Sequence, residues 1–234
     1  MPFTLGIITA RGGSKGIKDK NIVPLNGRPL IHYSIDAAKG CDCIDDLVLS
    51  TDSQKIADIA ERAGLSCEGL RPDYLSTDAA KSADVLKYEI ELYQNKTNQK
   101  IDTVILLQPT APLRCAEDID KAYDLYVSGG QKSLISCYNA DFVHPQIMYE
   151  KEGETLSPFL KEGHTIVRRQ EMKPVYVRNG AIYIFDCDYF LDSGRTVCEK
   201  PALYEMPKNR SINIDAPDDL ELAAFFMQKD GVRL

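Results

Sequence analysis

Short apolar runs alternate with amphipathic stretches along most of the chain. The apolar runs are typical of buried strands and fall at Leu5–Ala10, Asp46–Ser50, Thr103–Leu107, Leu134–Tyr138, Gly180–Phe185 and Ser211–Ile214. Between them, apolar positions recur at helical spacing and predict helices at Pro29–Lys39, Ser53–Ala63, Ser82–Gln94, Glu117–Val127 and Asp218–Gln228. Strands that alternate with helices predict an α/β fold with a mostly parallel sheet and helices on both of its faces.

The alternation stops between Asn139 and Val177. Prolines and glycines interrupt this polar segment, and only Gln146–Tyr149 and Thr165–Arg168 have the pattern of short strands. A segment of this length without regular structure is unusual inside a compact domain, and such segments are commonly functional. We therefore expect a single Rossmann-like domain over residues 1–234, with residues 139–177 as a hairpin excursion from its sheet.

Composition restricts the classes of function. The 234 residues are 44% hydrophobic and 27% charged, with a formal net charge of −7, which argues against broad binding to nucleic acids or anionic membranes. Met1–Thr4 lacks the basic start of a signal peptide, and the apolar runs are too short to span a membrane. The seven cysteines form no C-x-x-C pair, and Cys41 and Cys43 are closer than the usual zinc spacing. We expect a cytoplasmic protein with reduced thiols.

Against this acidic background, the segment from Thr9 to Asn21 is basic. It follows the first predicted strand and holds three glycines and four cationic side chains, those of Arg11, Lys15, Lys18 and Lys20. Ligands of α/β sheets bind beyond the carboxyl ends of the strands, and glycines let backbone N–H groups approach an anion. The spacing fits neither G-x-x-x-x-G-K-[ST] nor G-x-G-x-x-G. A solvated surface loop is the plainer interpretation, but the concentration of charge favours a site for a small anion.

This segment also carries a family resemblance. Ala10–Gly16 with Lys20 and Asn21 resembles the nucleotide-binding signature of the acylneuraminate cytidylyltransferases, which include synthetases for CMP-sialic, CMP-legionaminic and CMP-pseudaminic acids. Further blocks follow in the family's order at Ser50–Asp52, Leu70–Pro72, Leu106–Arg114, Arg169–Gln170, Asn179–Ile184 and Ser211–Asp215. The resemblance implies transfer of CMP from CTP to the anomeric hydroxyl of an acidic nine-carbon (nonulosonic) sugar, with release of pyrophosphate and with Mg²⁺ as cofactor.

The resemblance assigns nucleotide contacts residue by residue. It implies that Arg11, Ser14 and Asn21 hold the nucleotide and that Lys20 contacts the reacting α-phosphate. Arg71 and Ser82 fall where the family contacts the ribose and the base. Fixed cations near the phosphates stabilise the charge that develops on the leaving group, so Arg11 and Lys20 are candidate catalytic residues.

A second set of residues is expected to bind the sugar. Gln108 follows an apolar strand and suits a sugar hydroxyl, and Tyr183 lies in a strand that matches the family's pocket. An arginine can recognise the sugar carboxylate with two hydrogen bonds, and Arg169 matches the family's residue for this contact. In the family the excursion crosses into the neighbouring subunit, so the resemblance implies a homodimer in which Arg169 completes the partner's pocket.

The block Ser211–Asp215 departs from the family's pattern. Relatives have Asp-x-Asp here, with both carboxylates serving Mg²⁺, whereas this chain has Asn213 and Asp215. Mg²⁺ prefers hard oxygen ligands, so we expect Asp215 to be the main metal ligand and a catalytic group, with Asn213 as a weaker ligand. A helix cap is the structural alternative for Asp215.

Two other functions stay open on the sequence alone. Asp186 and Asp188 form an Asp-x-Asp pattern that in metal-dependent glycosyltransferases binds the cation of a nucleotide sugar, although a turn at the end of a strand also explains it. The change at Asn213 also allows a nucleotide-binding relative without catalysis. Arg11, Lys20, Gln108 and Asp215 are all present, which favours the cytidylyltransferase.

Overall fold

The computed structural model describes residues 2–14, 16–77, 80–141, 143–160 and 172–229. The strands are β1 (Thr4–Thr9), β2 (Pro24–Leu25), β3 (Arg28–Pro29), β4 (Asp46–Ser50), β5 (Thr103–Leu107), β6 (Ser133–Asn139), β7 (Tyr149–Glu152), β8 (Thr155–Pro158), β9 (Tyr176–Asp186) and β10 (Ala202–Glu205). The α-helices are α1 (Leu30–Gly40), α2 (Gln54–Arg62), α3 (Ser82–Thr97), α4 (Ala116–Gly129), α5 (Cys187–Ser193) and α6 (Pro217–Lys229), and short 3-10 turns include η1 (Lys20–Ile22), η3 (Pro145–Ile147) and η5 (Lys208–Arg210).

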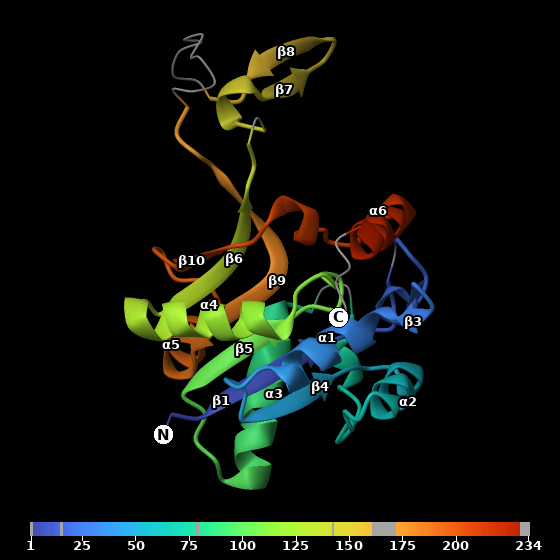
Figure 1. The fold of residues 1–234 in the computed structure, drawn as a ribbon. Helices are drawn as coiled ribbons and strands as arrows, with labels where there is room; N and C mark the ends of the chain where they lie inside the picture. Colours follow the sequence, from blue (N-terminus) through green and yellow to red (C-terminus); the bar gives the residue numbers. More distant parts are fainter. Residues whose placement is uncertain (1, 15, 78–79, 142, 161–171, 230–234) are drawn as a thin grey trace.

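The central sheet has the strand order β10-β6-β9-β5-β1-β4 (Figure 1). Strands β4 and β5 both pair with β1 in parallel, and β10 pairs with β6 in parallel. Only β9 runs against its neighbours β5 and β6 within the described sheet. The expectation of a mostly parallel sheet is confirmed, and the carboxyl ends of β1 and β5 meet at one edge, where parallel sheets bind ligands.

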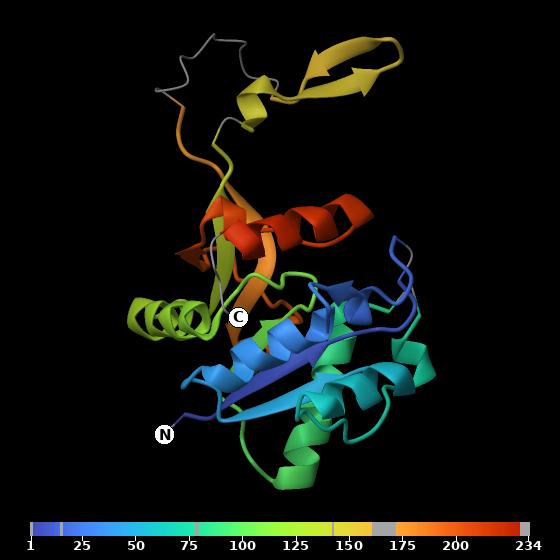
Figure 2. The ribbon, with the colours of Figure 1, turned by 45° about the vertical axis from the view of Figure 1, so that its right-hand side comes forward.

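Helices cover both faces of the sheet, as the sequence predicts (Figure 2). On one face, apolar side chains of α1, α2 and α4 pack against inward residues such as Ile8, Ile105 and Ile184. On the other face, α3 and α5 pack against the alternate residues, such as Ile7 and Phe185. The period of two along β1, β5 and β9 therefore divides each strand between two apolar cores.

Helix α6 closes a third, smaller core. Its Ala223 and Met227 pack with Leu25 and Leu30, close to the turn that follows the basic loop. Ile214, just before α6, belongs to the same core and donates its N–H to the carbonyl of Thr110 at 2.7 Å. The C-terminal segment is thereby held beside the carboxyl edge of β5.

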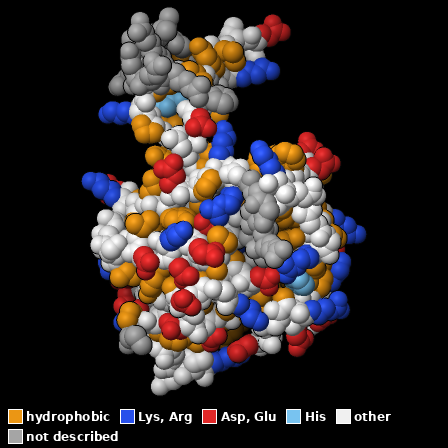
Figure 3. Space-filling model, in the orientation of Figure 1, with side chains coloured by type: hydrophobic (Ala, Val, Ile, Leu, Met, Phe, Trp, Pro, Cys, Tyr) orange, Lys and Arg blue, Asp and Glu red, His pale blue; other side chains and the backbone are white. Residues whose placement is uncertain are grey.

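A hairpin arm projects from this body (Figure 1). Strands β7 and β8 pair antiparallel, with Tyr149 opposite Pro158, and β6 and β9 lead into the arm from the central sheet. Hydrophobic side chains gather on the arm, which stands clear of the body in the space-filling view (Figure 3). The described part of residues 139–177 thus has the hairpin character that the sequence predicts.

Some local expectations are wrong. Ser211–Ile214 forms no strand, since the segment crosses the carboxyl edge instead of extending the sheet. Its place is taken by β10, an edge strand whose half-exposed Ala-Leu-Tyr-Glu sequence lacks an apolar run. Most of the strand expected at Gln146–Tyr149 is replaced by the 3-10 turn η3, which Pro145 starts because proline suits the first turn of a helix, and a strand begins only at Tyr149. The short strand expected at residues 165–168 lies outside the described residues.

Candidate active site

A cavity of about 550 Å³ opens at the carboxyl edge of β1 and β5. Its walls come from four segments: the basic loop after β1, the region from Arg71 to α3, the loop after β5, and the segment before α6. Among the expected site residues, those that line it are Arg11, Ser14, Lys20, Asn21, Arg71, Ser82, Gln108, Asn213 and Asp215. Residues that are more than two hundred positions apart in the chain therefore share one cavity.

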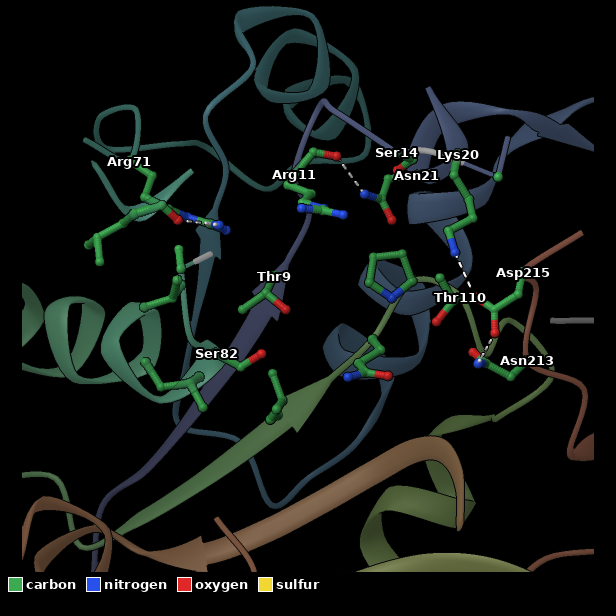
Figure 4. A pocket seen from close by; sticks show the side chains of 18 of the residues that line it. Thr9, Arg11, Ser14, Lys20, Asn21, Arg71, Ser82, Thr110, Asn213 and Asp215 are labelled. Atoms are coloured by element: carbon green, nitrogen blue, oxygen red, sulfur yellow. Dashed lines mark hydrogen bonds and ion pairs between the residues drawn. The ribbon is translucent and has the colours of Figure 1, made fainter. Parts of the chain in front are cut away.

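The cavity has two ends, which Figure 4 shows from close by. Arg71 and Ser82 lie on one side, and Lys20, Asp215 and Asn213 lie on the other, with Arg11 between them. Ser82 is the first residue of α3, so the positive end of that helix dipole is directed at the cavity. The cavity thus presents positive electrostatic character along much of its length.

Hydrogen bonds fold the basic loop into the cavity wall. Asn21 is buried, and its Nδ2 donates to the carbonyl oxygen of Arg11 at 2.9 Å. Gly12 donates its N–H to Asp52 Oδ1 at 2.7 Å, which ties the loop to the end of β4. Asn21 therefore shapes the backbone beneath Arg11, in addition to any contact of its own with a ligand.

Lys20 joins the loop to the C-terminal segment. Its Nζ lies 2.8 Å from Asp215 Oδ1, and the lysine side chain is only 17% exposed. Gly16 approaches the same residue by backbone, because a Cβ at position 16 would lie 2.5 Å from the carbonyl oxygen of Asp215. A glycine is therefore required at position 16 for the two segments to come into contact. From the sequence alone, the glycines of this loop were explained only by the approach of backbone N–H groups to an anion.

Asn213 and Asp215 lie side by side, as the metal assignment requires. Asn213 Nδ2 donates to Asp215 Oδ2 at 3.0 Å. Asn213 Oδ1 is buried and has no hydrogen-bond partner among the described residues. An unsatisfied buried carbonyl oxygen beside a carboxylate is a suitable donor set for a hard cation.

Gly180 brings Gln108 into this group. Its φ of 74° is left-handed, and a Cβ there would lie 3.0 Å from Gln108 Oε1 and 3.6 Å from Asn213 Oδ1. A side chain at position 180 would therefore be strained by the left-handed backbone and would crowd the Gln108 amide, whereas its contact with Asn213 would be an ordinary one. The backbone of Gln108 is fixed by Arg114, whose Nη1 donates a hydrogen bond to the Gln108 carbonyl oxygen at 3.1 Å.

Arg71 is a wall residue whose guanidinium is already engaged. Nε donates to Ser50 Oγ at 3.0 Å, and Nη2 donates to the carbonyl oxygen of Ser50 at 2.9 Å. Burial lowers the pKa of Arg71, while the nearby carboxylates of Asp52 and Glu89 act in the opposite direction. Burial likewise raises the pKa of Glu89, against the effect of its hydrogen bond to Ser50 and of Arg71. Arg71 thus fixes the cavity wall at the end of β4.

Tyr183, an expected sugar ligand, is not among the residues that line the cavity. Tyr183 pairs with Leu106 across β5 and β9 and packs against the core under α3 and α5, where burial raises its pKa. Since Leu106 does line the cavity, Tyr183 is its neighbour on the same face of the sheet. Arg169 lies outside the residues that the structure describes.

The Asp186–Asp188 pattern lies at the opposite edge of the sheet. Asp186 is opposite Thr103, the first residue of β5, whereas the cavity lies beyond the last. Asp186 caps α5 by accepting the N–H of Tyr189 at 2.7 Å and forms an ion pair with Lys132. Asp188 forms an ion pair with Lys100. The two carboxylates of the glycosyltransferase alternative therefore lie at the other end of β5 from the cavity, each in an ion pair with a lysine.

Buried groups to which the sequence assigned no role support the site. Arg114 is 1% exposed, donates to the carbonyls of Gln108 and Ala111 and to Ser34, and burial lowers its pKa to about 9. Arg210, just before Ser211, donates to the buried Asp118 carboxylate at 2.6 Å. Burial alone would raise the pKa of Asp118, but the contact with Arg210 and other hydrogen bonds lower it.

Asn179 completes this support. Its Oδ1 accepts a hydrogen bond from Ser136, and its Nδ2 donates to Ser211 Oγ at 3.0 Å. It thereby connects the turn at Gly180 with the segment that carries Asn213. No spacing in the sequence indicates these contacts, because each joins residues of different elements.

A family model described as cytidylyltransferase matches residues 5–232. The pseudaminic acid cytidylyltransferase of Campylobacter jejuni is 33% identical over 94% of this chain and 94% of its own length. The CMP-N,N'-diacetyllegionaminic acid synthase of Legionella pneumophila is 34% identical over 96% of both chains.

Two further matches extend the comparison. An N-acylneuraminate cytidylyltransferase of Streptococcus agalactiae is 34% identical over 91% of this chain, which spans 50% of that relative's length. Among solved structures, a CMP:2-keto-3-deoxy-manno-octonic acid synthetase complexed with CTP superposes with a TM-score of 0.69 at 16% identity, covering 97% of this chain and 99% of that one. The structural likeness supports the fold.

Proposed function

The chain belongs to the cytidylyltransferase family, and we propose that it transfers CMP from CTP to the anomeric hydroxyl of a nonulosonic acid and releases pyrophosphate. The observation that carries the proposal is the cavity in which Arg11, Lys20 and Asp215 converge. Its positive groups suit a triphosphate, and we assign its opposite end, at Ser82, to the nucleoside. The relatives that are similar over most of their length bear the names of such activities.

Arg11 and Lys20 supply the charge for the transfer. Attack of the sugar hydroxyl on the α-phosphorus places negative charge on the leaving pyrophosphate, and fixed cations stabilise it without reorganisation. Lys20 is held by Asp215, which supports this role because it fixes Nζ at the end of the cavity that we assign to the phosphates. Ser14 and Asn21 hold the loop and the nucleotide, and Arg71 and Ser82 bound the nucleoside end.

We assign the sugar to the region of Gln108. The Gln108 amide lies beside Gly180, between the loop after β5 and the metal ligands, where it can bind a sugar hydroxyl. Sialic, pseudaminic and legionaminic acids share a C1 carboxylate and a C2 hydroxyl, and the named relatives cover all three. Tyr183 borders this region beside Leu106, and Arg169 is assigned to the carboxylate on the family resemblance alone.

Mg²⁺ is the cofactor that we propose. The buried, unsatisfied Oδ1 of Asn213 and the carboxylate of Asp215 would hold it, and both groups line the cavity. When bound, the ion neutralises phosphate charge and lowers the pKa of the attacking hydroxyl. Asp215 is shared in this arrangement, because Lys20 pairs with the same carboxylate in the structure.

We also propose a cytoplasmic homodimer built through the arm. Apolar side chains on it are strongly exposed, with Leu156 at 65%, Tyr149 at 51% and Phe159 at 50%. A second copy of the chain would bury them and bring the partner's segment 161–171, which includes Arg169, toward the sugar pocket. Sizing at low micromolar concentration should give twice the chain mass, and Leu156→Glu should weaken the dimer. A monomer with full activity would contradict the proposal.

Among the described helices, none has the length and apolar character to span a bilayer.

Pyrophosphate release tests the function. The protein is incubated with CTP, Mg²⁺ and, separately, N-acetylneuraminic, pseudaminic, legionaminic and 3-deoxy-manno-octulosonic acids. We expect release that depends on one of the three nine-carbon acids and on CTP, with UTP and ATP as control nucleotides. Release with the eight-carbon acid alone, or with none of the acids, would contradict the proposal.

A further inference from the structure

A second cluster of ligand-type side chains lies away from the cavity. Cys41 directly follows the last residue of α1, Cys43 comes two residues later, and Asp120 is in the second turn of α4. None of the three lines the cavity. Two residues beyond Cys43, Asp45 donates its N–H to Thr4 at the start of β1, which places this loop toward the amino end of the sheet.

The geometry of the cluster matches a metal site. The two sulfur atoms are 4.0 Å apart, and one ligand atom from each of the three residues lies within 4.8 Å of the others. Tetrahedral zinc with Zn–S bonds of about 2.3 Å separates its two sulfur ligands by about 3.8 Å. The thiols therefore need little movement to share one ion.

The third ligand is fixed by the same short loop. Asp120 Oδ1 accepts the backbone N–H groups of Asp42 at 2.9 Å and Cys43 at 3.2 Å. The carboxylate is thus held against the segment that carries both cysteines. Cys41 is 8% exposed, while Cys43 and Asp120 are partly exposed, so the cluster is sheltered but open to entry from solvent.

The donor set indicates which ion would bind. Two thiolates and one carboxylate form a borderline-soft set, which suits Zn²⁺ better than Mg²⁺ or monovalent copper. The C-x-C spacing alone is too short for the usual zinc sites, and the sequence does not show that Asp120 comes beside it. We propose that Cys41, Cys43 and Asp120 bind one thiophilic divalent cation of the zinc class, separate from the catalytic cavity.

Binding would link α1 to α4 through the metal. As Zn²⁺ replaces the thiol protons, two Zn–S bonds form and the protons pass to solvent, with no change of oxidation state. An ion that binds only the folded chain also raises its thermal stability.

Cobalt titration tests the site. The full chain, metal-free and fully reduced, is titrated with Co²⁺, and the thiolate-to-cobalt charge-transfer absorption is recorded. We expect one ion per chain, displacement by Zn²⁺, and loss of the absorption in Cys43→Ser. Outer-shell partners of a metal affect affinity by about 10-fold to 100-fold, so Asp120→Asn should weaken binding at least tenfold. Cys67→Ser, at a partly exposed cysteine elsewhere, should bind as the parent does.

Two results would overturn the proposal. One is the lack of a charge-transfer band when thiol titration shows Cys41 and Cys43 to be reduced; the other is a band that survives Cys43→Ser with unchanged affinity. Asp120→Asn keeps the shape of the side chain, so it remains informative if the cysteine variant does not fold, and an unchanged affinity there would also overturn the three-ligand site. Because the signal requires thiolate ligands, binding at Asp215 does not produce it. The result is independent of the cytidylyltransferase assay.

Discussion

Lys20 Nζ lies 2.8 Å from Asp215 Oδ1, an ion pair that joins two residues 195 positions apart. It connects the basic loop after β1 with the segment before α6, and so unites the phosphate end of the cavity with the assigned metal ligand. Phosphate binding and Mg²⁺ binding, as we propose them, therefore both depend on this ion pair.

Lys20→Ala tests the phosphate role. Removal of one preorganised donor in other enzymes lowers turnover by about two to three orders of magnitude, and we expect a similar loss here. Lys18→Ala is the matched control, since Lys18 is an exposed lysine on the same loop outside the cavity lining. Pyrophosphate release would be measured for both at saturating CTP. Near-parent turnover in Lys20→Ala, or an equal loss in Lys18→Ala, would contradict the assignment.

Gly16→Ala tests the contact between the loop and Asp215. The added Cβ would lie 2.5 Å from the carbonyl oxygen of Asp215, so one of the two segments must shift. Displacement of a catalytic group by about 1 Å can lower the rate about 100-fold, and we expect a loss of that order. Gly13→Ala adds a Cβ with nothing within 4 Å and should lose much less turnover. Equal kinetics for the two variants would show that the contact does not matter.

Asp215→Asn tests the metal assignment. With amides at both positions, no carboxylate remains for Mg²⁺, and activity should collapse. Asn213→Asp restores the family's pair of carboxylates and should lower the Mg²⁺ concentration needed for half-maximal rate. Titration of Mg²⁺ for the parent and both variants side by side gives the comparison. An unchanged Mg²⁺ midpoint in Asp215→Asn would place the ion elsewhere.

Gly180→Ala tests the support of Gln108. Gly194→Ala is the control, because Gly194 has a similar φ of 67°, against 74° at Gly180, and a Cβ there meets nothing within 4 Å. Both substitutions place alanine in a left-handed conformation at a cost of about 1 kcal/mol in stability, measurable by urea unfolding. Only Gly180→Ala crowds Gln108 Oε1, so only it should raise the KM for the sugar. A similar KM in both variants would remove Gln108 from the sugar site.

The alternation of apolar runs and amphipathic stretches predicted the layers of this fold well. Thr103–Leu107 is buried at every position, and Asp46–Ser50, although partly exposed, still has the apolar run from residue 47 to residue 49 that marks a strand. The edge strand β10 was not predicted because its half-exposed residues form no apolar run. The strand predicted at Ser211–Ile214 was wrong because its isoleucines pack in the core beside α6 without joining a sheet.

The sequence likewise predicted one part of the candidate site and not another. The family blocks indicated the residues that line the cavity, from Arg11 to Asp215. The blocks include Arg114 and Asn179 but gave them no role, and they omit Asp118, because these residues act through hydrogen bonds between separate elements. Such contacts depend on tertiary packing and leave no periodic or spaced pattern in one sequence.

The fate of the CTP phosphates tests the central claim most directly. The protein is given CTP labelled with ³²P at either the α- or the γ-phosphate, together with Mg²⁺ and the nonulosonic acid that supports pyrophosphate release. The account predicts that the α label appears in a CMP-sugar and the γ label in pyrophosphate, in equal amounts. An α label that stays in CTP or appears only as CMP, or a γ label transferred to the sugar, would contradict it.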